Sequence, residues 1–218
     1  MMKDLRKVLL GIVCFLLFSC MSESIELPAG VAVDLGLSVK WASCNVGAIS
    51  PEDYGGYYAW GEVEEKTNYS WSTYKWCNGS YCSQTKYCTD SYYGTVDNKT
   101  TLDPEDDVAH VQWGGNWRMP TEAELRELCH KCSWSWTSVN GVNGYQVTGP
   151  NGNNIFLPAA GFRDSEEVYG CGTESINWSV TLDDDLDNMA CSLNFSYSGY
   201  YRTSCSRFYG ITVRPVTE

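Results

Sequence analysis

Helix signals are concentrated in one stretch near the middle of this 218-residue chain, and they constrain the fold more than any other feature. Pro104 suits the first turn of a helix, with Asp103 as the N-cap and three acidic residues behind it that the helix dipole favours. Gly114 and Gly115 then stop that helix. The pattern predicts a short helix over residues 104–112.

A second helix is predicted directly after this break. Thr121 is a capping residue, and Glu124 stands three residues later, as in a capping box. Leu125 and Leu128 supply an apolar stripe. We therefore expect a helix over residues 121–131 with Leu125 in the core.

Strand and turn signals occupy most of the remaining chain, and everything after Ser133 is typical of strands and turns. A glycine-rich turn at 149–153 predicts a hairpin of residues 144–148 and 154–157. Residues 69–93, rich in Tyr, Trp, Ser and Cys but without a period, are expected to form an inserted surface loop (hereafter the insertion). Further strands are expected at 33–41, 57–60, 176–181, 190–197 and 209–216.

Composition restricts the class of protein and of partner. A chain of this length is typical of one domain with a substantial core. The net charge of −12 argues against a nucleic-acid partner, because phosphate backbones attract basic surfaces. After the N-terminus, no window is long and apolar enough to cross a bilayer.

The N-terminus has the pattern of a targeting segment, residues 1–20. A basic start is followed by the apolar run Val8–Phe18, and the ending Leu17-Phe18-Ser19-Cys20 resembles a bacterial lipobox. That resemblance implies a diacylated Cys20 as the mature N-terminus, and two acyl chains give stable anchoring. The alternative is an ordinary secretory peptide in which Cys20 is incidental. Because Met21 is not the aspartate linked to inner-membrane retention, we expect a lipid-anchored, surface-exposed protein of the outer membrane, with residues 21–32 as a polar tether.

Several motifs in fixed order resemble the Fibrobacter succinogenes major paralogous domain, over residues 33–218. They are Val33–Ala42, Tyr57–Glu62, Trp117–Thr121, Gly141–Tyr145, Phe156–Gly161 and Tyr209–Val216. The resemblance implies a surface lipoprotein of the kind common in gut Bacteroidetes.

A wider resemblance concerns the fold. Asp107–Trp113 and Met119–Leu125 are similar to segments of the formylglycine-generating enzyme family. That resemblance implies an α+β, C-type-lectin-like fold, in which two helices pack on a small, twisted, mostly antiparallel β-system with long loops. The two predicted helices fall where that fold has its own.

Nine cysteines remain after Cys14 and Cys20, so at least one is free or intermolecular. We interpret them as buried thiols or a few disulfides, with a metal or redox site at Cys129-His130-Lys131-Cys132 as the alternative. The formylglycine-generating resemblance would place a catalytic pair at Cys191 and Cys205. The arginine- and glycine-rich surroundings of that family's active site are missing.

Other signals for chemistry are few. Asp183, Asp185 and Asp187 offer oxygen ligands of the type that Ca²⁺ takes, but their spacing matches no EF-hand, and a solvated acidic turn is the simpler interpretation. The only histidines, His110 and His130, lie near no nucleophile motif. The prediction is a non-enzyme without a cofactor, with calcium left open. Four tryptophans are assigned to the core, with a sugar-stacking platform as the alternative: Trp113, Trp117, Trp134 and Trp136.

The last segment, 190–217, contains no Lys, Glu, Gln, Met or Trp, whereas Ser, Tyr, Asn, Thr, Cys and Arg recur. This composition is what randomised adenines in AAC codons produce, as in the variable proteins of diversity-generating retroelements. A fixed binding face, or exposed strands with an ordinary composition, are the alternatives.

The sequence thus predicts a surface-anchored, non-enzymatic module that binds a protein or a glycan through this segment. We expect Phe195 and Tyr197 to point inward from a strand and the residues from Tyr200 to lie on the following loop. An enzyme related to the formylglycine-generating family and a structural surface or fimbria-associated component are the alternatives. The candidate contact residues are Asn194, Tyr197, Tyr200, Tyr201 and Arg202.

Overall fold

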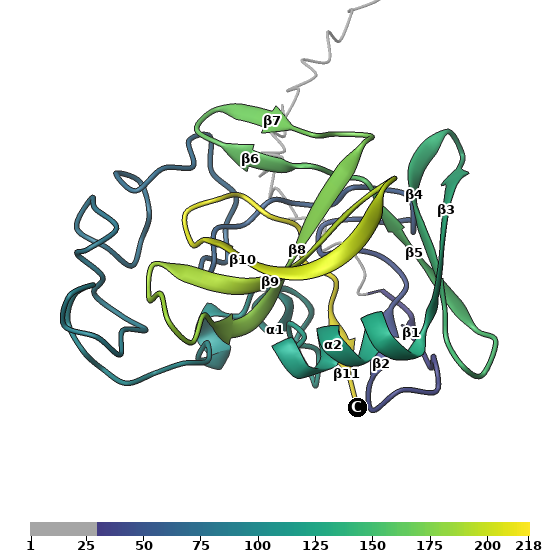
Figure 1. The fold of residues 1–218 in the computed structure, drawn as a ribbon, viewed down its shortest axis with the longest axis horizontal. Coiled ribbons are helices and arrows are strands. Elements are labelled where there is room, and N and C mark those ends of the chain that lie inside the picture. The colour runs from purple at the N-terminus through teal and green to yellow at the C-terminus, as the bar shows by residue number, and fades with distance from the viewer. Residues whose placement is uncertain (1–29) are drawn as a thin grey trace, which may run out of the picture.

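The computed structural model describes residues 30–218, so the predicted signal peptide, the acylated Cys20 and most of the tether lie outside the described residues. Its fold is α+β, with two α-helices and several small antiparallel sheets (Figure 1). Helix α1 spans Val108–Trp113 and helix α2 spans Glu122–Lys131. A 3₁₀ turn, η1, covers Pro104–Asp106.

The prediction of one helix starting at Pro104 is confirmed only in part: η1 starts there with Asp103 in the N-cap position, but the Asp103 side chain makes no capping hydrogen bond and the α-helix begins at Val108. Asp107 caps α1 instead, because its carboxylate accepts hydrogen bonds from the backbone N–H groups of Ala109 and His110. To do so Asp107 takes an extended backbone, which separates η1 from α1.

The predicted start of α2 is confirmed. Thr121 and Glu124 form the reciprocal capping box, each side chain accepting from the other's backbone N–H. Leu125 and Leu128 are fully buried, as the apolar stripe requires.

The strands form four sheets. One joins β1 (Ala32–Val33), β2 (Lys40–Ala42) and β11 (Val216–Thr217), and a second joins β3 (Ser133–Val139), β4 (Val142–Thr148) and β5 (Asn154–Pro158). A small hairpin pairs β6 (Phe162–Asp164) with β7 (Glu167–Tyr169). The longest strands, β8 (Glu174–Leu182), β9 (Met189–Ser196) and β10 (Gly199–Ser206), are ordered β10-β9-β8.

The predicted hairpin around residues 149–153 is confirmed as β4 and β5. The predicted strand over 33–41 is wrong, because it divides into β1 and β2. The side chain of Asp34 accepts from the backbone N–H of Gly36, whose φ of +74° turns the chain between the two. The segments at 57–60 and 209–216 form mostly isolated bridges, such as Tyr58 to Ile211, rather than strands.

The sheet β8-β9-β10 lies between two apolar clusters. Ile176, Trp178 and Val180 of β8 belong to the first. Leu193 and Phe195 of β9 belong to the second, together with α2 and the β3-β4-β5 sheet. Both faces are therefore covered along β8 and β9, whereas Tyr201 and Arg202 of the edge strand β10 are exposed.

The insertion contains neither helix nor strand, but it is more than a surface loop, because Tyr69, Tyr74 and Tyr87 are buried. The side chain of Arg207, fully buried beneath it, donates to the Tyr74 hydroxyl and to the carbonyl oxygens of Lys86, Tyr87 and Asp187. The buried arginine thereby attaches the insertion to the core.

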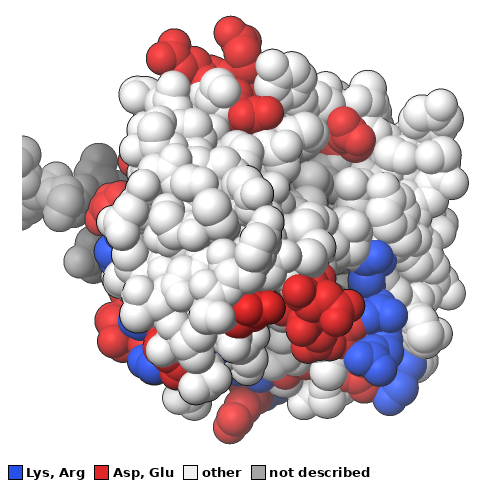
Figure 2. Space-filling view, turned by 60° about the vertical axis from the view of Figure 1, so that its left-hand side comes forward, with Lys and Arg blue, Asp and Glu red and all other residues white. Residues whose placement is uncertain are grey.

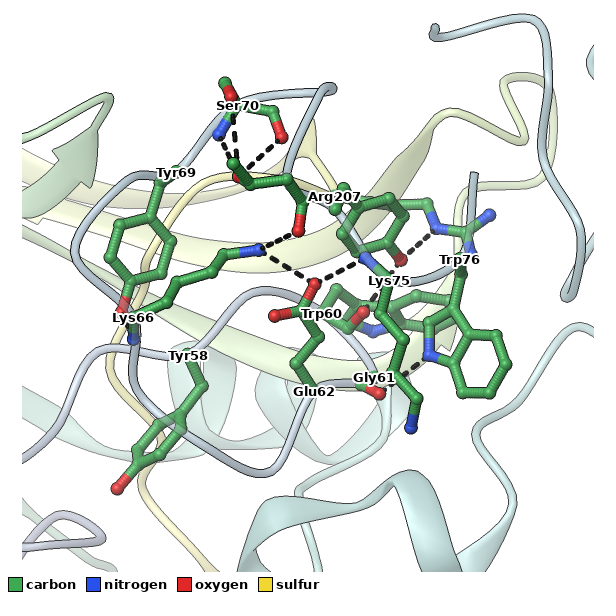
Figure 3. A network of polar contacts seen from close by, with 12 residues as sticks. Tyr58, Trp60, Gly61, Glu62, Lys66, Tyr69, Ser70, Lys75, Trp76 and Arg207 are labelled. Atoms are coloured by element: carbon green, nitrogen blue, oxygen red, sulfur yellow. Dashed lines mark hydrogen bonds and ion pairs between the residues drawn. The ribbon is translucent and has the colours of Figure 1, made fainter. Parts of the chain in front are cut away.

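Figure 3 shows the polar network at this attachment. The Tyr74 hydroxyl donates to the carbonyl of Trp60 over 2.8 Å. Glu62 accepts from the Lys66 ammonium and from the backbone N–H of Lys75, both over 2.8 Å. This network ties the first part of the insertion to the segment around Trp60.

Candidate functional site: the β9–β10 hairpin and the groove beside it

The five predicted contact residues lie on one hairpin but not on one face. Tyr200 pairs with Phe195 and Arg202 with Leu193, so their side chains share the face that meets α2 and the second apolar cluster. Tyr201 pairs with Asn194, and these two side chains share the opposite face.

Two expectations about this hairpin are wrong. Tyr200, Tyr201 and Arg202 lie on β10 rather than on a loop, and Tyr197 points outward with 74% of its surface exposed. The reason is the tight reversal at residues 197–198, followed by Gly199 with a φ of +145°. This turn takes Tyr197 out of the strand alternation and lets the chain pair back along β9.

Tyr200 is a packing residue as well as a surface residue. Its ring stacks on that of Trp134 with a centroid distance of 4.2 Å and an interplanar angle of 19°. It also meets Tyr145 edge-on at 5.9 Å. Burial raises the pKa of its hydroxyl above the ordinary value. Tyr201, by contrast, is 59% exposed and free to contact a partner.

A groove runs between β10 and α2, which we call the α2–β10 groove. Its largest hollow, about 540 Å³, is lined by Cys129, His130, Tyr200, Tyr201 and Arg202. A smaller hollow of about 190 Å³ shares Arg202 with it and is also lined by Glu122, Cys191, Thr203 and Ser204. The groove then reaches a hollow of about 320 Å³ that shares Glu122 and Cys191 and ends at Asp183, Asp184 and Asp185.

The groove changes character along its length. One end presents Tyr201 and His130, the middle is crossed by an ion pair between Arg202 and Glu122, and the far end is acidic. Glu122 also pairs with Arg126 one helical turn along α2. Figure 2 shows an acidic patch and a basic patch side by side at the lower right of one face, with separate acidic side chains along its top.

The calcium candidates are not brought together. Asp187 is buried, and its carboxylate accepts from the backbone N–H groups of Thr89 and Asp90 and from the Thr89 hydroxyl, at 2.6–2.9 Å. Asp183 accepts from the backbone of its own turn, and Asp185 is exposed. Across residues 30–218, no three His, Cys, Asp or Glu side chains are grouped so that they could hold a metal ion.

The nine cysteines of residues 30–218 are all unpaired. Burial raises the pKa of Cys129 and of Cys132 to about 11, so both thiols are protonated at neutral pH. Cys191 pairs with Ser204 and Cys205 with Ala190, which places the two sulfurs on opposite faces of the hairpin. They do not form the pair that the formylglycine-generating resemblance would require.

The two histidines of the described chain lie in different places. His110 lies on α1, where its Nδ1 is 3.3 Å from the Trp117 carbonyl oxygen. His130 lines the α2–β10 groove.

Sequence reasoning missed the contribution of α2. Glu122, Arg126 and His130 line the groove from one helix, and the i, i+4 spacing of Glu122 and Arg126 marks a charged, exposed helix face. That signal was available in the sequence. The sequence did not indicate, however, that this helix face lies beside β10.

None of the helices within residues 30–218 is long and apolar enough to cross a membrane. Comparison of the chain with models of known protein families, with curated proteins and with solved structures found no match.

Proposed function

We propose that the chain is a lipid-anchored binding module of the bacterial outer membrane, without enzymatic activity, that takes an extended segment of a partner protein into the α2–β10 groove. The proposal includes a C-type-lectin-like fold and membership of the Fibrobacter succinogenes major paralogous domain. The helices α1 and α2 beside small antiparallel sheets support the fold proposal. So does the sheet β1-β2-β11, which joins the two ends of the described chain.

The observation that carries the proposal is the unpaired outer edge of β10 along an open groove. β10 is eight residues long, and β9 is its only partner strand in the described part of the chain. The backbone groups on its other edge can therefore pair with an added strand. A protein segment supplies such backbone groups, whereas a glycan does not.

The side chains at this edge suit a protein contact. Tyr and Arg dominate binding energies at protein interfaces because they bury much area or offer several donors. Tyr201 is exposed, and Arg202 and Glu122 already form an ion pair that a charged residue of the partner can join. The acidic end at Asp183–Asp185 favours a basic residue at the corresponding end of the partner segment.

A test uses linear peptides selected from a random display library on the purified full chain, with affinities measured by biolayer interferometry. Tyr201→Ala and Arg202→Ala should each weaken binding about tenfold or more, as truncated hot-spot residues do. Tyr92→Ala is the matched control, since Tyr92 is 61% exposed but lies on the insertion. Peptides N-methylated at alternate positions should lose binding, because they cannot pair with β10.

Three results would count against the proposal. If N-methylated peptides bind as well as the unmodified peptides, pairing with β10 is excluded as the mode of binding. A loss confined to Tyr92→Ala would move the site to the insertion. Binding to a glycan array that is lost in Tyr201→Ala, with no peptide selected, would change the partner class to glycan.

The proposal that segment 190–217 is diversified is limited by its buried residues. Leu193, Phe195, Arg207 and Arg214 are at most 1% exposed, and replacing them would cost packing or leave buried acceptors unpaired. Diversification compatible with the fold is therefore confined to exposed positions such as Tyr197. A near-repeat of this segment and a reverse-transcriptase gene beside the coding sequence would support the proposal of diversification. Their absence would contradict it.

A further inference from the structure

A separate hollow of about 380 Å³ lies among η1, α1, the start of α2 and β8. Its apolar wall is formed by Leu102 and Val180, each 6% exposed, together with Pro104. The volume is in the range of small-ligand pockets. It shares no lining residue with the α2–β10 groove, although Thr121 of the hollow directly precedes Glu122 of the groove.

Two of the charged side chains that line this hollow, Asp107 and Arg118, are already engaged. The Asp107 carboxylate accepts from the backbone N–H groups of Ala109, His110 and Met119. The Arg118 guanidinium donates two hydrogen bonds to Glu124, at 2.6 and 2.8 Å. Neither therefore offers a free charge to a ligand without losing these partners.

The polar groups that remain unused are neutral. Thr101, Asn116 and Trp117 line the hollow, and their side chains make no hydrogen bond to another residue within 30–218; Thr101 and Asn116 are exposed. The Trp117 ring is held edge-on against Trp113, with centroids 5.2 Å apart at 85°. The hollow thus combines a fixed aromatic ring and an apolar wall with unpaired neutral donors and acceptors.

This combination matches one kind of ligand. Hydroxyl and amide groups both donate and accept, as the hydroxyls of a sugar do. A pyranose ring also has a C–H face that packs on an aromatic or aliphatic surface, and a single ring fits a hollow of this size. A charged ligand finds no free counter-charge here except the exposed Glu218 at the rim.

We propose that this hollow binds one neutral pyranose unit, with Trp117 and the Leu102–Val180 wall against the ring and with Asn116 and Thr101 on its hydroxyls. The site is separate from the α2–β10 groove, so a failure of the sugar proposal would not affect the proposal of a protein partner, and the reverse also holds. It also assigns Trp117 a role different from that of Trp113, Trp134 and Trp136, which pack against the apolar clusters.

The test is ligand-observed NMR by saturation transfer on the full chain, with glucose, galactose, mannose, N-acetylglucosamine, glucuronate and glucosamine as probes. We expect at least one neutral sugar to bind with a dissociation constant of about 1 mM or tighter. Asn116→Ala and Thr101→Val should each weaken it about three- to tenfold, as loss of a neutral hydrogen bond does. Asn116→Trp, which fills the hollow from an exposed position, should abolish it.

The controls separate this site from the rest of the surface. Asn78→Ala, at an exposed asparagine of the insertion, and Tyr201→Ala, in the groove, should leave sugar binding unchanged. Unfolding curves check that each variant is folded. No saturation transfer from any neutral sugar, undiminished binding in a folded Asn116→Trp variant, or tighter binding of glucuronate or glucosamine than of every neutral sugar would each overturn the proposal.

Discussion

At the scale of single residues, Glu124 has two roles at the start of α2. Its carboxylate completes the capping box with Thr121 and accepts two hydrogen bonds from Arg118. Burial opposes ionisation of this carboxyl, but the Arg118 guanidinium and the Thr121 N–H outweigh it and hold the pKa of Glu124 below its ordinary value. Glu124 therefore connects the start of α2 to Arg118, which lines the hollow proposed to bind a sugar.

This lowered pKa has a consequence for stability. Because the folded chain favours the charged form, Glu124 stabilises it fully above the ordinary pKa of 4.5, and this contribution is lost as pH falls through the lower folded value. Glu124→Gln should lower the free energy of unfolding at pH 7 by about 1–3 kcal/mol. The difference from the wild type should shrink as the pH is lowered below 4.5, as measured by urea denaturation at pH 7 and at successively lower pH. A difference that stays constant over this pH series would contradict the assignment of the charge.

At the scale of elements, the buried Arg207 makes one of the main attachments of the insertion to the core. Within residues 30–218 Arg207 forms no ion pair with a carboxylate; its guanidinium donates to three carbonyl oxygens and one tyrosine hydroxyl, and it lies 4.9 Å from the Trp60 ring centroid. Asp187 supplies a second attachment from the turn between β8 and β9. An irregular segment without strands of its own is ordered by these contacts.

We predict that Arg207→Met loosens the insertion before it affects the rest of the molecule. Each buried acceptor left unpaired costs about 1–3 kcal/mol, so the free energy of unfolding should fall by at least about 3 kcal/mol. Hydrogen exchange should accelerate at the amides of Gln84 and Thr85, which bond to backbone carbonyls in the insertion, and change less at those of β4. Arg126→Met, at an exposed arginine on α2, is the control and should cost little. Unchanged exchange in the insertion would show that Arg207 does not hold it.

At the scale of the whole molecule, the two ends of the described chain meet in one sheet. Val33 and Val216 both pair with Trp41 of β2. The first strand of the described chain, β1, belongs to the β1-β2-β11 sheet, while the α2–β10 groove is formed by other elements. An anchor attached at this end is compatible with a groove that stays accessible.

We predict that the mature chain starts at an acylated Cys20. Intact mass spectrometry of detergent-extracted protein should show the diacylglyceryl group on this residue, and Cys20→Ser should release the chain from the membrane fraction. Cys82→Ser, at an exposed cysteine of the insertion, is the control and should remain in the membrane fraction. A product cleaved at another position without a lipid would contradict the prediction.

The sequence by itself determined the elements whose signals are local. The capping box at Thr121 and the glycine-rich turn before β5 act within a few residues, so they identified α2 and the β4–β5 hairpin without any knowledge of the fold. The α+β class was expected from the resemblance to the formylglycine-generating enzyme family, with which the two locally predicted helices agreed. The chemistry of the C-terminal segment was also visible in its composition, although not its arrangement.

Only the tertiary structure decided which residues meet. Tyr200 and Tyr201 are neighbours of one type, but the register of β10 on β9 sends one to Trp134 and the other to solvent. Arg214 is buried because it reaches the side chain of Asn45 and two carbonyl oxygens from distant segments. Polar tyrosines and arginines are stable on the surface or in a fully bonded interior, so their burial depends on partners far along the chain that no local pattern specifies.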